Sequence, residues 1–404
     1  MQYIKNKLFL LATTITLGVS TGFAAVSDHT QQKTSDHPIY NKPSKDEKHY
    51  NLNLSLYRNY GTQIGVDAFY SVMEGYRFVV DETSEYVPGW AQGLVNFLIV
   101  APYITTWNHE ASGHALSTKQ FGGEVHKIHV DLFGGGGYTR ISLMDNTQKN
   151  IVVSIAGMQA DDLFANKITF NSIQNNRLTP VASAFYVWSY LDQFSYINGT
   201  DEKKSGDDVA SYIKKINQVY GNGSITQSRM KRNNWFDLLN PMVFYSFYSV
   251  FTNSTFSVPM IPLSSNIKWL PAVKYVITPS GYQFNLNNYF VAFDKTLNVI
   301  VGGGRTYNDK TTYSAQLNIP KFIELTEKLS IGINAAVWKQ PELFGSTPKT
   351  ESPKFGGMVI PRIEYTLMQN FNIYTEVGYK TNGFILGQTP EKTFILGGGL
   401  NYYW

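Results

Sequence analysis

Apolar and polar residues alternate with a period of two through the C-terminal third of the chain. In one segment Phe371, Ile373 and Val377 alternate with polar or small residues. Successive side chains of a β-strand point to opposite faces, so this pattern predicts strands with one apolar face. Turn-forming residues separate the segments. We expect strands at 268–278, 281–293, 296–305, 311–320, 328–338, 356–368, 371–381 and 392–404.

A second alternating stretch lies near residue 50. Leu52, Leu54 and Leu56 alternate with Asn and Ser, and residues 62–70 could pair with them across a turn at 58–61. We therefore expect residues 50–73 to form a β-hairpin that joins the strands of 259–404. The total is then about eight to ten strands.

The segment 74–258 has a different pattern, which predicts a mainly helical domain inserted between the strands. Its apolar runs are 94–105, 151–165, 181–191 and 238–251. None reaches the ~18–20 uninterrupted apolar residues that a membrane-spanning helix needs, so we interpret them as core helices. The polar run 198–208 predicts a loop, and an amphipathic helix is expected at 209–219.

The N-terminus has the organisation of a secretory signal peptide. Lys5 and Lys7 precede an apolar run at 8–19, and Gly22-Phe23-Ala24 is a small-residue cleavage site, so residues 1–24 are expected to be removed. Residues 25–49 are polar and aperiodic, which predicts a disordered leader. The chain has no cysteine and a net charge of +4, without a basic cluster that would indicate nucleic-acid binding.

The candidate chemistry lies in the string His109-Glu110-Ala111-Ser112-Gly113-His114. In an HExxH motif, two histidines at i and i+4 share one helical face and bind Zn²⁺, with the Glu as general base. Here the histidines are i,i+5, which a regular α-helix would separate by about 140°. A one-turn π-bulge would bring them back to within about 50°. Alternatively, Glu110 and His114 form the working i,i+4 pair.

The residues after this string give it a context. Phe121-Gly122-Gly123 follows, then an alternating segment at 125–130, a glycine run at 134–137, and Ala156-Gly157 within an apolar segment. This order resembles the site-two-protease-like zinc metallopeptidases over residues 97–168. The resemblance implies a zinc site with His109 and His114 as ligands and Glu110 as base. The chain departs from that family in the extra residue of the motif and in Met158, where the family usually has proline.

A third metal ligand is sought among acids on apolar helices, because a buried carboxylate without a partner is costly. Asp161 is the first candidate, since a helix over 151–168 would bury it. Asp162 and Asp237 are the alternative candidates for this ligand. Helix capping or an internal salt bridge is an equally good explanation of Asp161 and Asp162. For His126 and His129, we expect a structural or substrate-side role rather than ligation.

The last segment of the sequence indicates which kind of β-structure the strands form. Phe394, Leu396 and Trp404 share one face of the last segment, and the chain stops on that aromatic residue. Bacterial outer-membrane β-barrels end on a similar strand, which their assembly machinery reads. The 27 Tyr, 25 Phe and 33 Gly agree with aromatic girdles and curved strands. The expected fold class is therefore α+β, a C-terminal antiparallel barrel of outer-membrane type with an inserted helical domain. A soluble periplasmic β-domain is the alternative.

Together these patterns predict a protein exported to the outer membrane of a Gram-negative bacterium, in contact with lipid. Its expected activity is that of a Zn²⁺ metallopeptidase that acts on a peptide or protein substrate. The hairpin expected at 124–143 would offer an edge strand to an extended peptide. The competing hypothesis is a non-enzymatic barrel whose helical domain is a plug or scaffold with a vestigial metal motif.

Overall fold

The strands predicted in the C-terminal third form one antiparallel sheet. The computed structural model describes residues 50–58, 61–132, 136–142, 144–199, 206–343 and 352–404. The expected signal peptide at 1–24 and leader at 25–49 lie outside these residues. The fold is α+β, with a ten-stranded sheet and a helical region within the compact unit Pro43–Trp404.

The ten strands follow the order β1-β12-β11-β10-β9-β8-β7-β6-β5-β4. Their bounds are β1 Asn51–Tyr57, β4 Ile261–Ser264, β5 Ile267–Thr278, β6 Gly281–Ala292, β7 Lys295–Thr306, β8 Thr311–Glu324, β9 Leu329–Gln340, β10 Lys354–Met368, β11 Phe371–Lys380 and β12 Thr393–Tyr403. The eight strands predicted by alternation are confirmed as β5 to β12. The short β4 was not predicted, because four residues are too few to show the pattern. Since β1 and β4 do not pair, strand pairing does not close the sheet.

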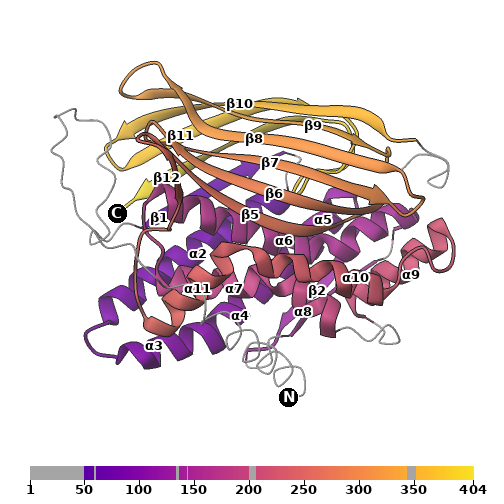
Figure 1. Ribbon diagram of the computed structural model, residues 1–404, viewed down its shortest axis with the longest axis horizontal. Coiled ribbons are helices and arrows are strands. Elements are labelled where there is room, and N and C mark those ends of the chain that lie inside the picture. The colour runs from indigo at the N-terminus through magenta and orange to yellow at the C-terminus, as the bar shows by residue number, and fades with distance from the viewer. Residues whose placement is uncertain (1–49, 59–60, 133–135, 143, 200–205, 344–351) are drawn as a thin grey trace. The chain divides into compact units, whose positions relative to one another are not determined.

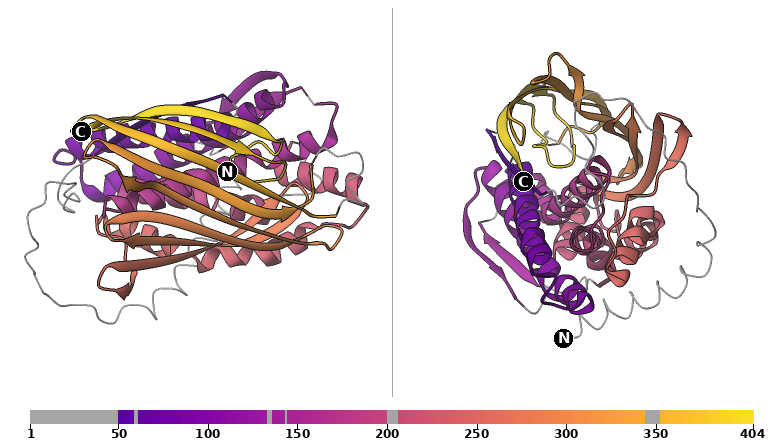
Figure 2. Two further views of the ribbon diagram at one scale, coloured as in Figure 1. Left: turned by 90° about the horizontal axis from the view of Figure 1, so that it is seen from above. Right: turned by 90° about the vertical axis from the view of Figure 1, so that its left-hand side faces the viewer.

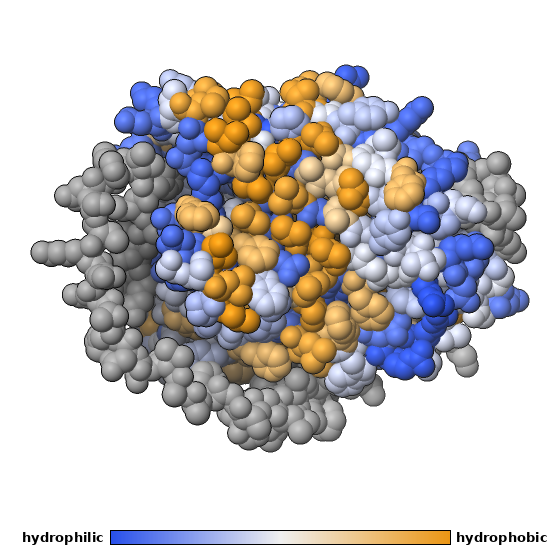
Figure 3. Space-filling model, turned by 45° about the horizontal axis from the view of Figure 1, so that its top comes forward, coloured by the Kyte–Doolittle hydropathy of each residue, from blue (hydrophilic) through white to orange (hydrophobic). Residues whose placement is uncertain are grey.

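The two faces of the sheet have unusual polarities. Apolar side chains are exposed on one face, where Leu286 lies opposite Val301. Figure 3 shows this apolar surface as an orange band. The other face carries buried polar side chains: Asn53, Gln283, Asn298, Ser314, Asn372 and Asn401. A sheet that folds in water usually buries its apolar face, so the polarity of this sheet is inverted.

Helices pack under the curved sheet (Figures 1 and 2). They are α2 Gly61–Thr83, α3 Gly89–Val95, α4 Ala101–Trp107, α5 Leu116–Gln120, α6 Thr147–Gln174, α7 Pro180–Tyr190, α8 Asp192–Gly199, α9 Asp208–Tyr220, α10 Gln227–Asn234 and α11 Pro241–Thr252. Two π-helical segments, η1 Asn96–Val100 and η2 Asn108–Ala115, and the 3₁₀-helix η3 Trp235–Leu239 complete the set. The expected hairpin is present as β2 Val125–Val130 and β3 Gly137–Ile141. Among the helices described, none is long and apolar enough to cross a membrane.

The prediction of a β-hairpin at 50–73 is wrong in its second half. Residues 51–57 form β1 as expected, but the next element is the helix α2. Its polar side chains recur every three to four residues and face the free edge of β1. The Asn51 N–H donates to Glu74 Oε2 at 3.1 Å, and the Asn53 N–H donates to Ser71 Oγ at 2.8 Å. A helix therefore occupies the place of the expected partner strand.

Candidate metal centre

The two motif histidines lie on a π-helical segment. η2 spans Asn108–Ala115, so the distortion that the i,i+5 spacing requires is present. The ring atoms His109 Nε2 and His114 Nε2 are 3.2 Å apart. The wider π turn rotates the second histidine back toward the first, and the two imidazoles converge.

A close helix crossing holds this segment in place. A Cβ atom on Gly113 would overlap the backbone of Gly157 in α6. A Cβ atom on Gly157 would in turn overlap the His109 ring. On the opposite side, Gly65 of α2 packs against Ser112. Glycine at these contacts lets three helices approach closely enough to bury the histidines among them.

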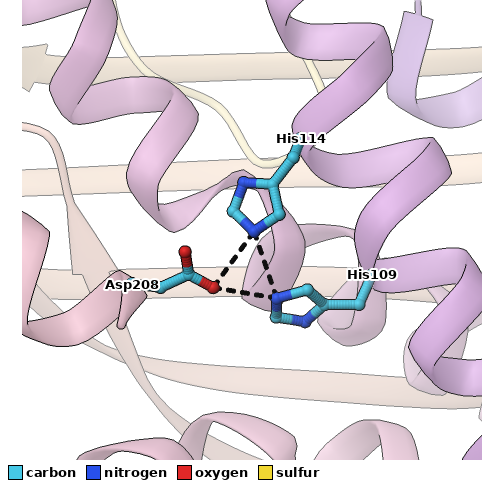
Figure 4. A group of neighbouring side chains, drawn as sticks. All are labelled: His109, His114 and Asp208. Carbon is cyan, nitrogen blue, oxygen red and sulfur yellow. Dashed lines mark hydrogen bonds and ion pairs between the residues drawn. The ribbon is translucent and has the colours of Figure 1, made fainter. Parts of the chain in front are cut away.

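The third group at the two Nε2 atoms is Asp208, as Figure 4 shows. Its Oδ2 atom lies 3.1 Å from His109 Nε2 and 3.1 Å from His114 Nε2. Asp207 caps α9 by accepting from the Ala210 N–H at 3.0 Å, which places Asp208 on the first helical turn. Burial alone would raise the pKa of Asp208, but His114 and His109 outweigh it and hold that pKa well below its usual value.

The outer nitrogen of each histidine has its own acceptor. His114 Nδ1 lies 2.7 Å from the Val153 carbonyl oxygen, which can only accept a hydrogen bond. His109 Nδ1 lies 3.0 Å from Asp161 Oδ2 and 3.2 Å from Asp192 Oδ2. In the neutral rings both Nδ1 atoms therefore carry the proton, and both Nε2 lone pairs point inward.

Two lone pairs and a carboxylate oxygen thus meet at one point, an arrangement that needs a proton or a cation. Burial would lower the pKa of His114, but Asp208 and Glu110 outweigh it and raise that pKa. Burial is likewise outweighed at His109, where Tyr196 and Asp192 raise the pKa well above its usual value. Tetrahedral zinc with bonds of about 2.0–2.1 Å needs ligand atoms roughly 3.3 Å apart. The spacings of 3.1–3.2 Å at this site fit that requirement.

The predicted third ligand, Asp161, lies on the other side of His109. It accepts from His109 Nδ1 and, through Oδ1, from Asn108 Nδ2 at 2.8 Å. Asp161 therefore orients His109, while Asp208 meets both Nε2 atoms. Asn108 thus helps to hold Asp161 in place. His109, Asp161 and Asp192 form a second group whose oxygen and nitrogen atoms could hold an ion.

Asp162 and Asp237, the alternative candidates for the third ligand, form a separate cluster with Lys274. Lys274 Nζ lies 2.7 Å from Asp162 Oδ1 and 3.4 Å from Asp237 Oδ2. Burial raises the pKa of Asp162 to about 6 and that of Asp237 to about 7. Both carboxylates face the lysine of β5, so they anchor helical elements to the sheet.

The proposed base, Glu110, belongs to η2, and its side chain faces the hairpin. Its Oε2 atom accepts from Thr139 Oγ1 of β3 at 2.7 Å, and its charge contributes to the raised pKa of His114. The two histidines of β2 lie at the surface. His126 bonds Ser142, and His129 pairs with Asp131. Neither belongs to the groups of possible ligands found among the described residues.

Sequence reasoning missed Asp208 and Asp192. Both begin a helix, where an acidic residue is ordinary because it interacts favourably with the helix dipole. Asp208 ends the polar run that we interpreted as a loop. The available signal was therefore a pair of acids, Asp207 and Asp208, before an amphipathic helix, and capping explains such a pair equally well.

Comparison with known proteins adds no family to this geometry. No protein-family model matches the sequence, and no curated protein matches it. The case for a metal centre therefore rests on the geometry of these side chains.

Proposed function

We propose that this protein is a zinc metallopeptidase anchored in the outer membrane of a Gram-negative bacterium. The observation that carries the proposal is the convergence of His109 Nε2, His114 Nε2 and Asp208 Oδ2 within 3.2 Å, beside Glu110. Catalytic zinc sites commonly combine three protein ligands of this kind with one position left for water. This donor set favours a catalytic over a closed structural site.

His109, His114 and Asp208 would hold the ion. Zinc, when bound, supplies Lewis-acid activation of water and of the scissile carbonyl. Glu110 accepts a proton from the attacking water and returns it to the leaving amine. Asp161 and the Val153 carbonyl oxygen keep the two rings in the tautomer that ligation requires. Thr139 restrains the carboxylate of Glu110.

The inverted sheet supports the membrane half of the proposal. Its exposed face is lined with large apolar side chains, among them Leu286, Val301, Val359 and Leu396. Alternation of an apolar outer face with a polar inner face is typical of strands in an outer-membrane barrel wall. We propose that the ten strands form such a wall, and that the assembly machinery recognises β12.

The experiment compares three variants with the parent protein. Glu110→Gln should keep one equivalent of zinc but lose peptidase activity, because an amide cannot take the proton. His114→Ala should lose the metal as well. His126→Ala is the control, because that side chain is exposed and bonds Ser142 away from the site, and it should retain both properties. Metal content is measured by elemental analysis, and cleavage with a peptide library in detergent.

Failure has a clear form. Zinc binding without cleavage by the parent would favour the scaffold hypothesis, in which the metal stabilises a helical plug. Equal zinc content and cleavage in all the variants would show that the motif is not the site.

A further inference from the structure

The helix α2 exposes apolar side chains on its outer side. Val72 and Phe78 are exposed, whereas the buried side carries Asp67, Ser71 and Glu74 together with apolar residues such as Met73. The outer side of a surface helix in water is normally polar. The solvent outside α2 is therefore expected to be apolar.

The next helical stretch continues this surface. Residues 89–107 contain no charged residue. Within α3, η1 and α4 the exposed side chains are all apolar, namely Trp90, Leu94, Val95 and Leu98. α3 is joined to α2 through the hydrogen bond between Tyr76 and Asn96 of η1.

A third segment leads from there to the far edge of the sheet. Gly93 packs against the backbone of Val250 in α11, and Phe97 contacts Phe251. α11 has no charged residue, and it exposes Phe244, Tyr248 and Phe251. The chain then continues to β4, where Ile261 and Leu263 are exposed. The helices thus link β1 to β5, the neighbour of β4, through contacts of α2 with β1, of α3 with α11 and of α11 with β5. Figure 1 shows these helices near one another.

We propose that α2, α3 and α11 are the remaining part of the lipid-facing wall, closing the gap between β1 and β4 in place of strands. The occupant of this surface is the acyl-chain region of the bilayer. This inference rests on the proposed membrane anchoring, and it assigns to the helices a role beyond that of a plug.

The edge of β1 meets a requirement that lipid would impose. A strand edge in hydrocarbon leaves N–H and C=O groups unsatisfied, at several kcal/mol each. Here Glu74 accepts from the Asn51 N–H, while Ser71 accepts from the Asn53 N–H and donates to the Asn53 carbonyl oxygen at 2.7 Å. Side chains of α2 therefore satisfy the edge that a closed barrel would pair with another strand.

The polar end of this surface also fits a bilayer. Exposed Glu82 and Glu85 follow the last apolar residues of α2, and exposed Tyr86 and Trp90 lie beside them in sequence. Aromatic residues next to charged ones are typical of the boundary between hydrocarbon and water. A second copy of the chain would explain one apolar patch, but it would not require an apolar surface continuous from β1 to β4.

The absence of cysteine allows a direct test by single-cysteine labelling. Leu94→Cys and Phe244→Cys report the helical surface, Val301→Cys reports the sheet, and Glu85→Cys is the polar control. Each full-length variant receives a nitroxide label in phosphatidylcholine vesicles. The measured quantity is the ratio of collisions with oxygen, which concentrates in hydrocarbon, to collisions with a water-soluble nickel chelate.

The inference predicts that labels at 94 and 244 match the label at 301, with ratios several-fold above that at 85. Labels at 94 and 244 that behave like the one at 85, with 301 still in lipid, would overturn this inference and leave the anchored sheet intact. Labels at 94 and 244 shielded from both reagents would also overturn it, because a protein surface would then cover the helices. A water-exposed label at 301 would instead refute the membrane anchoring itself.

Discussion

At the scale of single residues, carboxylates contact His109 from opposite sides. Asp208 lies at Nε2, whereas Asp161 and Asp192 lie at Nδ1. Only the first also reaches His114, at 3.1 Å. In the proposed zinc site, this difference would make Asp208 a ligand and Asp161 a residue that positions His109, although both are aspartates on helices of the same region.

Replacing each carboxylate with its amide should therefore have unequal effects. Asp161→Asn should weaken zinc binding about 10–100-fold, as loss of an outer hydrogen-bond partner typically does. Asp208→Asn should weaken it further, because it removes a charged ligand. Competition with a chelator measures both affinities, and the exposed Asp131→Asn is the control. If Asp161→Asn abolishes binding while Asp208→Asn is harmless, the ion lies instead among Asp161, Asp192 and His109 Nδ1.

The buried cluster at Lys274 predicts a pH dependence of stability. Burial raises the pKa of Asp237 to about 7 from 3.8, so the folded state holds its proton more tightly than the unfolded chain does. Its contribution to stability is complete below the unfolded pKa and is lost as the pH rises through 7. The free energy of unfolding should fall between about pH 4 and 7, by at most about 1.4 kcal/mol per pH unit for this proton.

Asp237→Asn should flatten that dependence, because the amide does not titrate. Thermal unfolding in detergent at several pH values provides the measurement, and the exposed Asp309→Asn serves as the matched change. A parent protein whose stability rises between about pH 4 and 7, or a variant with the parent's slope, would contradict the assignment.

At the scale of elements, the metal centre depends on the crossing of η2 and α6. Gly113→Ala would place a methyl group on the backbone of Gly157, and overpacking of this kind costs about 1–3 kcal/mol. We expect a lower thermal midpoint and weaker zinc binding. Gly75→Ala in α2 is the control, since a Cβ there meets nothing within 4 Å and alanine favours a helix by about 0.5–1 kcal/mol. Equal midpoints for the two variants would show that the crossing tolerates a side chain.

At the scale of the whole molecule, β12 links β1, the first strand, to the other strands of the sheet. It pairs with β1 on one side and with β11 on the other. The Trp404 N–H also donates to the Tyr50 carbonyl oxygen at 3.2 Å. Loss of this strand would therefore free two strand edges at once.

Deletion of Lys392–Trp404 should abolish insertion into the outer membrane, because the freed edges leave backbone groups unsatisfied in lipid. Membrane fractionation and protease protection measure the outcome. A charged residue in place of Trp404 should slow assembly without preventing it. A truncated protein that stays soluble, monomeric and folded in the periplasm would argue against a membrane wall.

The strands and the candidate motif from His109 to His114 could be predicted from the sequence, because their signals are local. Alternation with a period of two located β5 to β12, and the i,i+5 spacing of His109 and His114 required a π turn that η2 provides. The same reasoning misassigned residues 62–70 as a strand, whereas they belong to α2. The polar spacing of α2 is explained only by the edge of β1 that it contacts.

Only the tertiary structure decided which acid meets the histidines and how the sheet ends. Asp208 is 94 residues from His114 in the sequence, and contacts across such a distance leave no periodic trace in it. Asp161 has the stronger local signal, being buried in an apolar helix, but the rotation of α6 directs it to His109 Nδ1. Residue types thus determined the elements and the available chemistry, whereas the packing of α6 against η2 and α9 determined the donor set.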